Sequence, residues 1–338
     1  MTKHLVRRAT SLACAMTCAA AFAAPARAAT HYTLVDLGAW SVPARINRSH
    51  EIVGMAAGFT AQATWRDGAW TPIELPASIE FPQSASFAGI NAAGKIVGSA
   101  PTGAGGLPQP LVVDADGTAT VDVSDIQGCA LSAINDRGTI MGSCLGNSTT
   151  FLVKDGIRTD IAPPQAGEIF VGQAMNRHND VAGLLFRGGP TDVALYANGK
   201  WTTILSLPTE SAQVSAMNDA RHVVGTNIVV SGSTLIDECF FHDGRTVKYQ
   251  VMDGCQPTGI NNRDQVVGWY GGASTPSVAF FAEPGHAMTD LQSLVNDMPR
   301  HWTLRRAVGI SDDGAIIGEA FSADDSTNHG FLLVPLAR

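Results

Sequence analysis

The sequence predicts an all-β fold, a seven-bladed β-propeller built from four-stranded blades. Three observations predict it. A short motif occurs seven times, a second hairpin signal occurs in every period, and the two ends of the chain carry complementary strands. A motif of fixed internal spacing on a period of about 44 residues is the signature of a repeat architecture.

The repeated motif is clearest at residues 134–142, which read Ile-Asn-Asp-Arg-Gly-Thr-Ile-Met-Gly. Its second position is polar, and a glycine follows seven residues later in every copy. The polar residues are Asn47, Asn91, Asn135, Asn176, Asn218, Asn261 and Ser311, and the glycines are Gly54, Gly98, Gly142, Gly183, Gly225, Gly268 and Gly318. This spacing predicts seven copies of one structural unit.

Each motif is typical of a tight hairpin, since a type I turn favours Asn at its first position and Gly at its fourth. Gly, Asn or Asp fills the fourth position in five copies, and these residues tolerate positive φ. His50 and Arg221 fill it in the other two, so we expect those turns to be strained or differently shaped. Small residues such as Gly89 fill the position two before the Asn and indicate close packing between neighbouring elements. Arg45 is the exception to this pattern, in the first copy.

A second hairpin signal, Asp-Gly or Asn-Gly between apolar runs, occurs for example at 67–68, 155–156, 198–199 and 243–244. Two hairpins in each period supply the four strands of a propeller blade. The segment 32–38 matches the last strand of a second hairpin, the strand that follows the turn.

The segment 330–334 matches the first strand of a second hairpin, and no second strand follows it in the sequence. Pairing of the N-terminal strand with this C-terminal strand would close the ring and remove exposed sheet edges. The alternative is an open β-solenoid, which would need polar end caps that the sequence does not show.

Residues 1–28 have the features of a secretory signal peptide: a basic start, an apolar middle and an Ala-x-Ala site ending at Ala28. The remaining residues, 29–338, are predicted to form a single propeller domain that is secreted, to the periplasm or the extracellular space. The alternative, a membrane anchor, needs a longer uninterrupted apolar run. Cys14 and Cys18 fall in the segment predicted to be removed.

The predicted secreted chain is acidic. The formal charge is −8 for the whole sequence, and removing the four basic residues of the signal segment lowers it to −12. This acidity argues against nucleic acid and anionic membrane surfaces as partners. The sequence contains no second membrane-spanning run, and we expect a monomer without a cofactor.

Four cysteines remain in the predicted secreted chain, and an even number suggests disulfides in an exported protein. Their positions within the repeats predict the pairs Cys129–Cys144 and Cys239–Cys255. The alternative is that they are buried free thiols. A zinc site is disfavoured because none of them have Cys-x₂₋₄-Cys spacing.

The predicted topology gives the propeller two different faces. We call the face that carries the turns within hairpins the turn face. The opposite one, which carries the links between hairpins and between blades, is the loop face. The links vary in length, and we expect 227–237 to be one of those that join two hairpins. Insertions gathered on one face are typical of a binding surface. The alternative is neutral drift in surface loops.

The longest link between blades is 296–306, whose Arg and Trp residues are suited to an anionic or sugar ligand because Trp stacks and Arg forks onto carboxylates. The alternative is that this segment forms a short helix covering the end of the ring. The candidate ligand-binding residues are Arg300, His301, Trp302, Trp269 and Glu80.

No catalytic or metal-binding motif is present in the linear sequence. The segment 114–117 begins like a calcium loop but lacks the later ligands. We therefore expect a binding or scaffold module, with a glycan or protein ligand on the loop face and no metal. The alternative is a propeller enzyme, a lyase or hydrolase, with its site over the central channel. Such an enzyme would bring together members of the set Glu80, Glu168, Glu210, His301 and Arg300.

The repeats resemble the HAF repeats of bacterial extracellular proteins, named for a His-Ala-Phe tripeptide. Residues 260–268 match the family's Ile-Asn-x-x-Gly-x-Val-Val-Gly pattern except at its glycine, 278–280 and 329–331 match the tripeptide in part, and 289–291 match its Asp-Leu ending. The opening 32–38 is similar to the family's usual mature start. The resemblance covers nearly all of the chain after residue 28. It implies export and a propeller-like fold, and it supplies no activity or catalytic residues.

Overall fold

The computed structural model describes the segments 30–56, 61–77, 79, 84–101, 106–120, 128–144, 149–189, 191–207, 211–231, 234–251, 254–271, 275–283 and 286–336. The predicted signal peptide, 1–28, lies outside the described residues, and so do Glu80 and Glu210.

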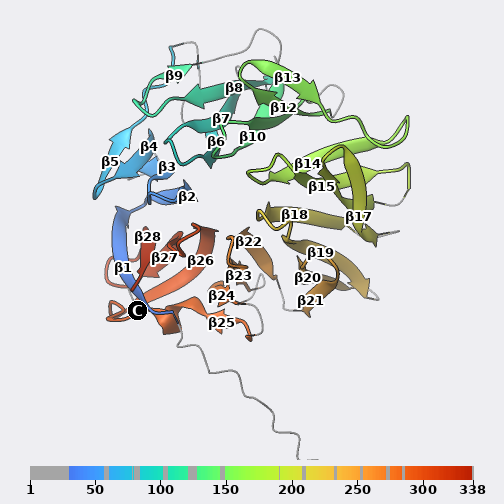
Figure 1. The fold of residues 1–338 in the computed structure, drawn as a ribbon. Coiled ribbons are helices and arrows are strands. Elements are labelled where there is room, and N and C mark those ends of the chain that lie inside the picture. Colours follow the sequence, from blue (N-terminus) through green and yellow to red (C-terminus); the bar gives the residue numbers. More distant parts are fainter. Residues whose placement is uncertain are drawn as a thin grey trace, which may run out of the picture.

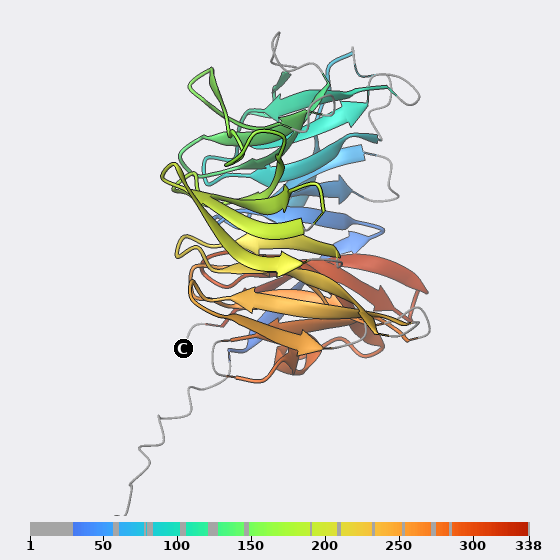
Figure 2. The same ribbon diagram turned by 90° about the vertical axis from the view of Figure 1, so that its right-hand side faces the viewer.

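Seven four-stranded antiparallel sheets form a ring of blades around a central axis, which confirms the predicted fold (Figure 1). Seen edge-on, the strands run across the thickness of the ring (Figure 2). From the innermost to the outermost strand, blade 1 contains β2 (Val42–Ile46), β3 (Ile52–Ala56), β4 (Ala61–Arg66) and β5 (Ala69–Pro72); blade 2 contains β6 (Ser86–Ile90), β7 (Ile96–Pro101), β8 (Pro108–Val113) and β9 (Ala119–Thr120); blade 3 contains β10 (Cys129–Ile134), β11 (Ile140–Cys144), β12 (Thr150–Lys154) and β13 (Ile157–Asp160); and blade 4 contains β14 (Ile169–Met175), β15 (Val181–Phe186), β16 (Thr191–Ala197) and β17 (Lys200–Leu207).

The ring continues in the same order. Blade 5 contains β18 (Ser211–Met217), β19 (Val223–Ser231), β20 (Thr234–His242) and β21 (Val247–Val251); blade 6 contains β22 (Gln256–Ile260), β23 (Val266–Tyr270), β24 (Val278–Ala282) and β25 (Thr289–Asp290); and blade 7 contains β26 (Trp302–Ile310), β27 (Ile316–Ser322), β28 (Thr327–Pro335) and β1 (Tyr32–Ala39). The N-terminal strand β1 pairs with the C-terminal strand β28, with Leu34 opposite Leu333. The predicted closure of the ring is therefore confirmed.

In six of the seven motifs, the asparagine connects its blade to the next one. Asn135 shows the arrangement: its Oδ1 accepts the backbone N–H groups of Arg137 and Thr139, both at 3.0 Å, and its Nδ2 donates to the backbone oxygen of Asn176 at 3.1 Å. Both halves of the amide are used, so neither Asp nor Ser could replace it fully. The same donation to the next blade is made by Asn47 (2.9 Å), Asn91 (3.4 Å), Asn176 (3.3 Å), Asn218 (3.0 Å) and Asn261 (3.1 Å). We call these six linked side chains the Asn ladder.

The seventh seam, between blade 7 and blade 1, is built differently. Ser311 stands in place of Asn, and its short side chain bonds within its own turn, to Asp313 and to the backbone oxygen of Ala315. The link to blade 1 is instead made by His50, whose Nε2 lies 2.6 Å from Oδ2 of Asp313. An ionisable pair thus closes the ring where the ladder ends.

All seven motif turns have the same backbone shape. The residue at the fourth position has positive φ in every copy, from 61° at His50 and Asp264 to 96° at Gly314. His50 and Arg221, at 61° and 66°, therefore adopt a strained backbone conformation in turns of ordinary shape, which is the first of the two expected alternatives.

The fixed glycine of the motif permits two close approaches. The inner strand contains a β-bulge opposite it, and a Cβ placed on Gly225 would lie 2.1 Å from the backbone oxygen of Gln213. On the other side it would lie 2.6 Å from the ring of Phe240, the residue paired with Gly225 on the third strand. Glycine is needed here because any side chain would separate the three strands.

Small residues two positions before the Asn also pack closely, as predicted. A Cβ on Gly89 would lie 2.9 Å from the backbone nitrogen of Ile134 in the next blade. Arg45 replaces this packing with a hydrogen bond between blades, from its Nε to the backbone oxygen of Ala88 at 2.9 Å. The surrounding protein atoms desolvate the guanidinium and lower its pKa, although the side chain still reaches solvent.

Both predicted disulfides are confirmed. Cys129 and Cys144 lie opposite each other in one hairpin, whereas Cys239 of β20 is bonded to Cys255, the residue before β22, and so ties blade 5 to blade 6. The segment 296–306 forms no helix; a 3-10 helix, η3 (Leu291–Leu294), precedes it and β26 begins within it. Among the described residues, no helix is long and apolar enough to span a membrane.

Candidate functional site

A polar hollow of about 390 Å³ opens toward the loop face between blades 6 and 7. It is lined by 275–277 from the link between β23 and β24, by Arg305 and Arg306 of β26, by Glu319 of β27 and by Asn328 of β28. We call it the Arg pocket. Its volume lies within the range of small-molecule sites.

A local irregularity in β26 places two successive arginines in the Arg pocket. Side chains at consecutive positions of a regular strand point to opposite faces. The pairing of β26 with β27 shifts between Leu304, opposite Ala320, and Arg306, opposite Glu319. Arg305 is the extra residue of this bulge, and the shift allows both guanidinium groups to line one hollow.

Aromatic rings hold both guanidinium groups in place. The Cζ of Arg305 lies 4.2 Å from the ring centroid of Phe321, and the Cζ of Arg306 lies 4.8 Å from that of Trp269. Stacking fixes the plane of a guanidinium while leaving its edge N–H donors available. In the described part of the chain, the side chains of Arg305, Arg306 and Glu319 make no ion pair with one another or with other residues.

This arrangement is suited to an anionic ligand. The planar guanidinium edge binds a carboxylate through two parallel hydrogen bonds, and two such groups line one hollow. The carboxylate of Glu319 and the amide of Asn328 can bond hydroxyl or amide groups of the same ligand. The site is thus equipped to recognise a carboxylate together with its polar neighbours.

The structure places the predicted residues in different settings. Trp269 contributes to the Arg pocket by stacking on Arg306. Trp302 is half-buried against the core of blade 7 and lies 4.6 Å from the ring of His329. Arg300 and His301 are exposed just before β26, and Nδ1 of His301 lies 2.9 Å from Oδ1 of Asp324. Glu80 lies outside the described residues.

Two described members of the set proposed for an enzyme lie on separate blades. Glu168 precedes β14 of blade 4, with its Oε1 3.7 Å from Nη1 of Arg187. His301 precedes blade 7 and contacts Asp324. Over the ranges that the structure describes, no group of three or more His, Cys, Asp or Glu side chains could hold a metal ion.

Sequence reasoning missed four residues of the Arg pocket: Arg305, Arg306, Glu319 and Asn328. Both arginines belong to the link singled out from its length, but strand alternation predicts opposite orientations for them. Glu319 and Asn328 come from other strands and become neighbours only through pairing in blade 7. The only signal in the sequence was the Arg-Arg doublet itself.

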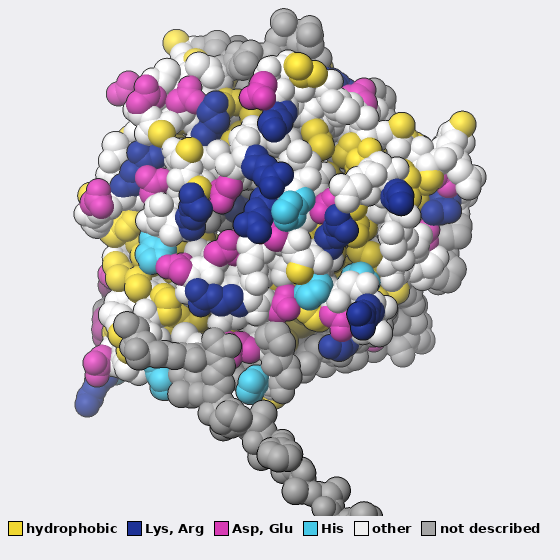
Figure 3. Space-filling model, in the orientation of Figure 1, with side chains coloured by type: hydrophobic (Ala, Val, Ile, Leu, Met, Phe, Trp, Pro, Cys, Tyr) yellow, Lys and Arg dark blue, Asp and Glu magenta, His cyan; other side chains and the backbone are white. Residues whose placement is uncertain are grey.

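The turn face offers a contrasting set of basic residues. Lys and Arg side chains lie near its axis and alternate with Asp, Glu and His (Figure 3). Many are paired: Nε of Arg221 lies 2.8 Å from Oδ2 of Asp180, and Nε of Arg177 lies 3.0 Å from Oδ2 of Asp219. Positive charge is therefore largely neutralised there, unlike in the Arg pocket.

Comparison with known proteins supports the fold. No protein-family profile and no curated protein matches the sequence. The chain is similar in structure to YCF48 bound to D1 peptide, with a TM-score of 0.54, 11% identity and coverage of 93% of this chain and 99% of that chain. It is also similar to the BP39L lectin from Burkholderia pseudomallei, with a TM-score of 0.51, 13% identity and coverage of 90% and 100%. At such identities the likeness establishes the propeller fold alone.

Proposed function

We propose that this protein is an exported binding module whose Arg pocket holds an anionic group of a glycan or protein ligand. The observation that carries the proposal is the pair of guanidinium groups, stacked on Phe321 and Trp269 and without ion pairs in the described part of the chain. Arg300, His301 and Trp302 extend the binding surface beyond the pocket. The structural neighbours named as a lectin and as a peptide complex support the view that such a ring can carry either kind of ligand.

The export part of the proposal rests on the signal-like segment 1–28 and on the two disulfides. Disulfides persist in oxidising compartments and are rare in the cytosol. The HAF-like repeats agree with export, and we propose that the protein acts as a monomer.

Residues 29–338 would be screened on a glycan array beside the double variant Arg305→Gln/Arg306→Gln. Loss of charge-assisted hydrogen bonds costs about 2 kcal/mol or more, so we expect acidic glycans to bind at least about 30-fold more weakly to the variant. The matched control is Arg48→Gln/Arg137→Gln, because both arginines are exposed on the turn face and lie outside the ion pairs of the described residues. This control should bind like the wild type.

Equal binding by the wild type and the Arg305/Arg306 variant would refute the assignment of the Arg pocket. If no glycan binds, the same proteins are compared on peptides that differ only by Asp for Asn or Glu for Gln. A lack of preference for the acidic peptides would then remove the proposal altogether. Arg300→Ala/Trp302→Ala tests the extended surface, with melting temperatures recorded because Trp302 packs on the core.

A further inference from the structure

A second cavity, of about 230 Å³, lies between blades 5 and 6, and we call it the blade 5–6 cleft. Three phenylalanines line it, Phe240 and Phe241 of β20 and Phe280 of β24, together with Met288. Cys239 lines it as well, so the disulfide to Cys255 belongs to its wall. The interior is apolar.

The outermost strand of blade 6, beside the cleft, is short. β25 pairs only two residues with β24, Phe280 with Asp290 and Phe281 with Thr289. In blade 4, by contrast, β17 is eight residues long and pairs with all of β16. Ala282, at the turn-face end of β24, therefore has no partner on β25, and it lines the cleft.

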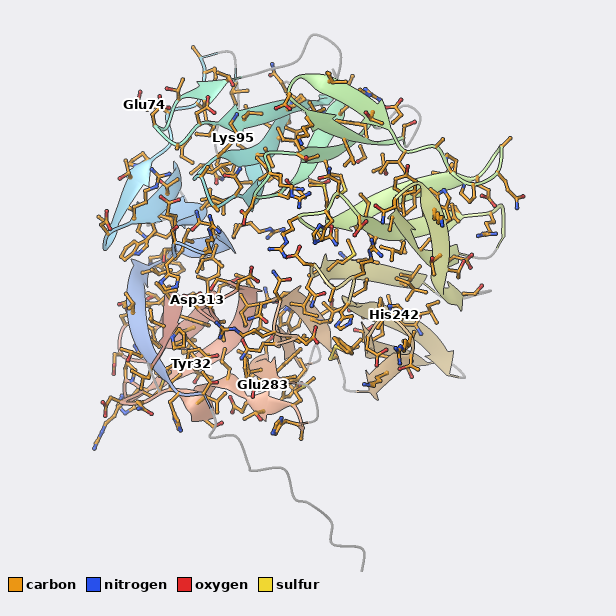
Figure 4. All side chains as sticks on the ribbon, viewed as in Figure 1. Tyr32, Glu74, Lys95, His242, Glu283 and Asp313 are labelled. Atoms are coloured by element: carbon orange, nitrogen blue, oxygen red, sulfur yellow. A yellow bond between two sulfur atoms is a disulfide. The ribbon has the colours of Figure 1, made fainter. Side chains whose placement is uncertain are left out.

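Two carboxylates from blade 6 line this largely apolar cavity. Asp264 belongs to the motif turn, and Glu283 follows β24, as its label in Figure 4 shows. Oδ1 of Asp264 accepts from Nδ2 of Asn218 at 2.7 Å and lies 2.6 Å from Nδ1 of His222. Oε1 of Glu283 accepts from Nε2 of Gln265 at 2.7 Å.

These contacts hold one oxygen of each carboxylate. The second oxygen of each makes no hydrogen bond within the described residues. Lys248 and His286 also line the cleft. Lys248 does not form an ion pair with either carboxylate in the described part of the chain, since its Nζ lies 3.2 Å from Oδ2 of Asp243 and the side chain is largely exposed. The cleft thus combines a largely apolar lining with two positioned acceptors.

We propose that the blade 5–6 cleft binds a small primary amine with an aromatic body, which lies among the phenylalanines while the ammonium group donates to Glu283 and Asp264. The volume lies below the range of drug-sized sites, so the body is about one ring in size. A neutral ligand would forgo the charged hydrogen bonds, and an anionic one would meet two carboxylates. This site is independent of the Arg pocket on the opposite face.

The test is a calorimetric titration of residues 29–338 with phenethylamine, 2-phenylethanol and 3-phenylpropionate. These probes share the ring and differ in charge. We expect saturable binding of phenethylamine, at least about 5-fold weaker binding of the alcohol, and the weakest binding by the acid. Equal affinity for the three probes, or no saturable binding of phenethylamine, would overturn the proposal.

Glu283→Gln should lower the affinity for phenethylamine at least about 5-fold and leave that for 2-phenylethanol unchanged. The matched control is Glu74→Gln, an exposed carboxylate on blade 1 that is labelled in Figure 4. Unchanged affinity in Glu283→Gln would refute the role of the carboxylate. Met288→Trp, checked for folding by its melting temperature, should abolish binding by filling the cavity. The Arg305/Arg306 variant should bind phenethylamine normally, which separates this proposal from the one for the loop face.

Discussion

The two faces of this propeller use polar side chains in opposite ways. On the turn face, six asparagines repeat one set of hydrogen bonds from blade to blade. On the loop face, the Arg pocket has no counterpart in that repeat and depends on a bulge at Arg305 in one strand. The comparison teaches that residues common to the repeats assemble the ring. A specific binding site is better sought among residues that occur in one repeat alone.

Asn135→Asp tests the assembling role and should have the largest effect. Asn135 is 7% exposed, and aspartate would retain the acceptor but lose the donor to Asn176, placing a buried negative charge against a carbonyl oxygen. We expect the free energy of unfolding to fall by about 3–5 kcal/mol, the cost typical of an uncompensated buried charge. Chemical denaturation at neutral pH measures it.

The matched control is Asn198→Asp, in the second hairpin turn of blade 4. Asn198 is exposed and has φ of 52°, and Asp155 occupies the corresponding turn position of blade 3 with φ of 51°. This control should change stability by less than about 0.5 kcal/mol. Equal losses in both variants would mean that the ladder adds nothing beyond local turn preference.

Much of the fold was predictable because it follows from local patterns. The Asn and Gly positions predict hairpins, two hairpins predict a blade, and equivalent repeat positions predicted the Cys129–Cys144 and Cys239–Cys255 pairs. The segment 227–237 was expected to be a variable link, yet most of it extends β19 and β20, because its β-branched and apolar residues continue the pairing.

The candidate sites were less predictable because they depend on relations between strands. The donor of each ladder asparagine reaches a residue more than 40 positions away. The Arg pocket includes the register shift at Arg305, and the blade 5–6 cleft lies beside the short strand β25. Register shifts and strand ends arise from packing, which a linear pattern does not record.

The disulfides sharpen the comparison, since Cys255 stands at the loop-face end of β22, away from the ladder. The cysteines of the two pairs are 15 and 16 residues apart in the sequence. Loss of either bond should lower the free energy of unfolding by about 3 kcal/mol, because the unfolded chain gains conformational entropy. Their local effects should differ. Cys239→Ala/Cys255→Ala should speed hydrogen exchange in β22, whereas Cys129→Ala/Cys144→Ala should leave β22 unchanged. Equal exchange in the two variants would show that the inter-blade bond does not hold this seam.

Blade 7 is the exception to this comparison between the faces, because ionisable groups form contacts at both of its ends. On the turn face His50 contacts Asp313, and near the loop face His329 lies 3.0 Å from Asp36 and 2.9 Å from Asp325. Partial burial opposes a charged His329, but its hydrogen bonds with Asp325 and Asp36 outweigh burial and raise its pKa. For Asp313, burial is likewise outweighed, and the hydrogen bonds from Ser311 and His50 lower its pKa.

The smallest expected effect is therefore a dependence of stability on pH. A raised folded-state pKa means that the contribution of His329 is complete below about 6.5 and is lost as pH rises through the folded value; the contribution of Asp313 is present above about 3.8 and is lost as pH falls. The melting temperature of the wild type should fall between about pH 6 and 9. In His329→Gln this fall should be smaller by about 1–3 °C, since such pairs contribute no more than about 1 kcal/mol. The control His178→Gln changes an exposed histidine outside the ion pairs of the described chain and should keep the wild-type slope. If His329→Gln also kept that slope, the contact between β1 and β28 within blade 7 would owe its stability to strand pairing rather than to charge.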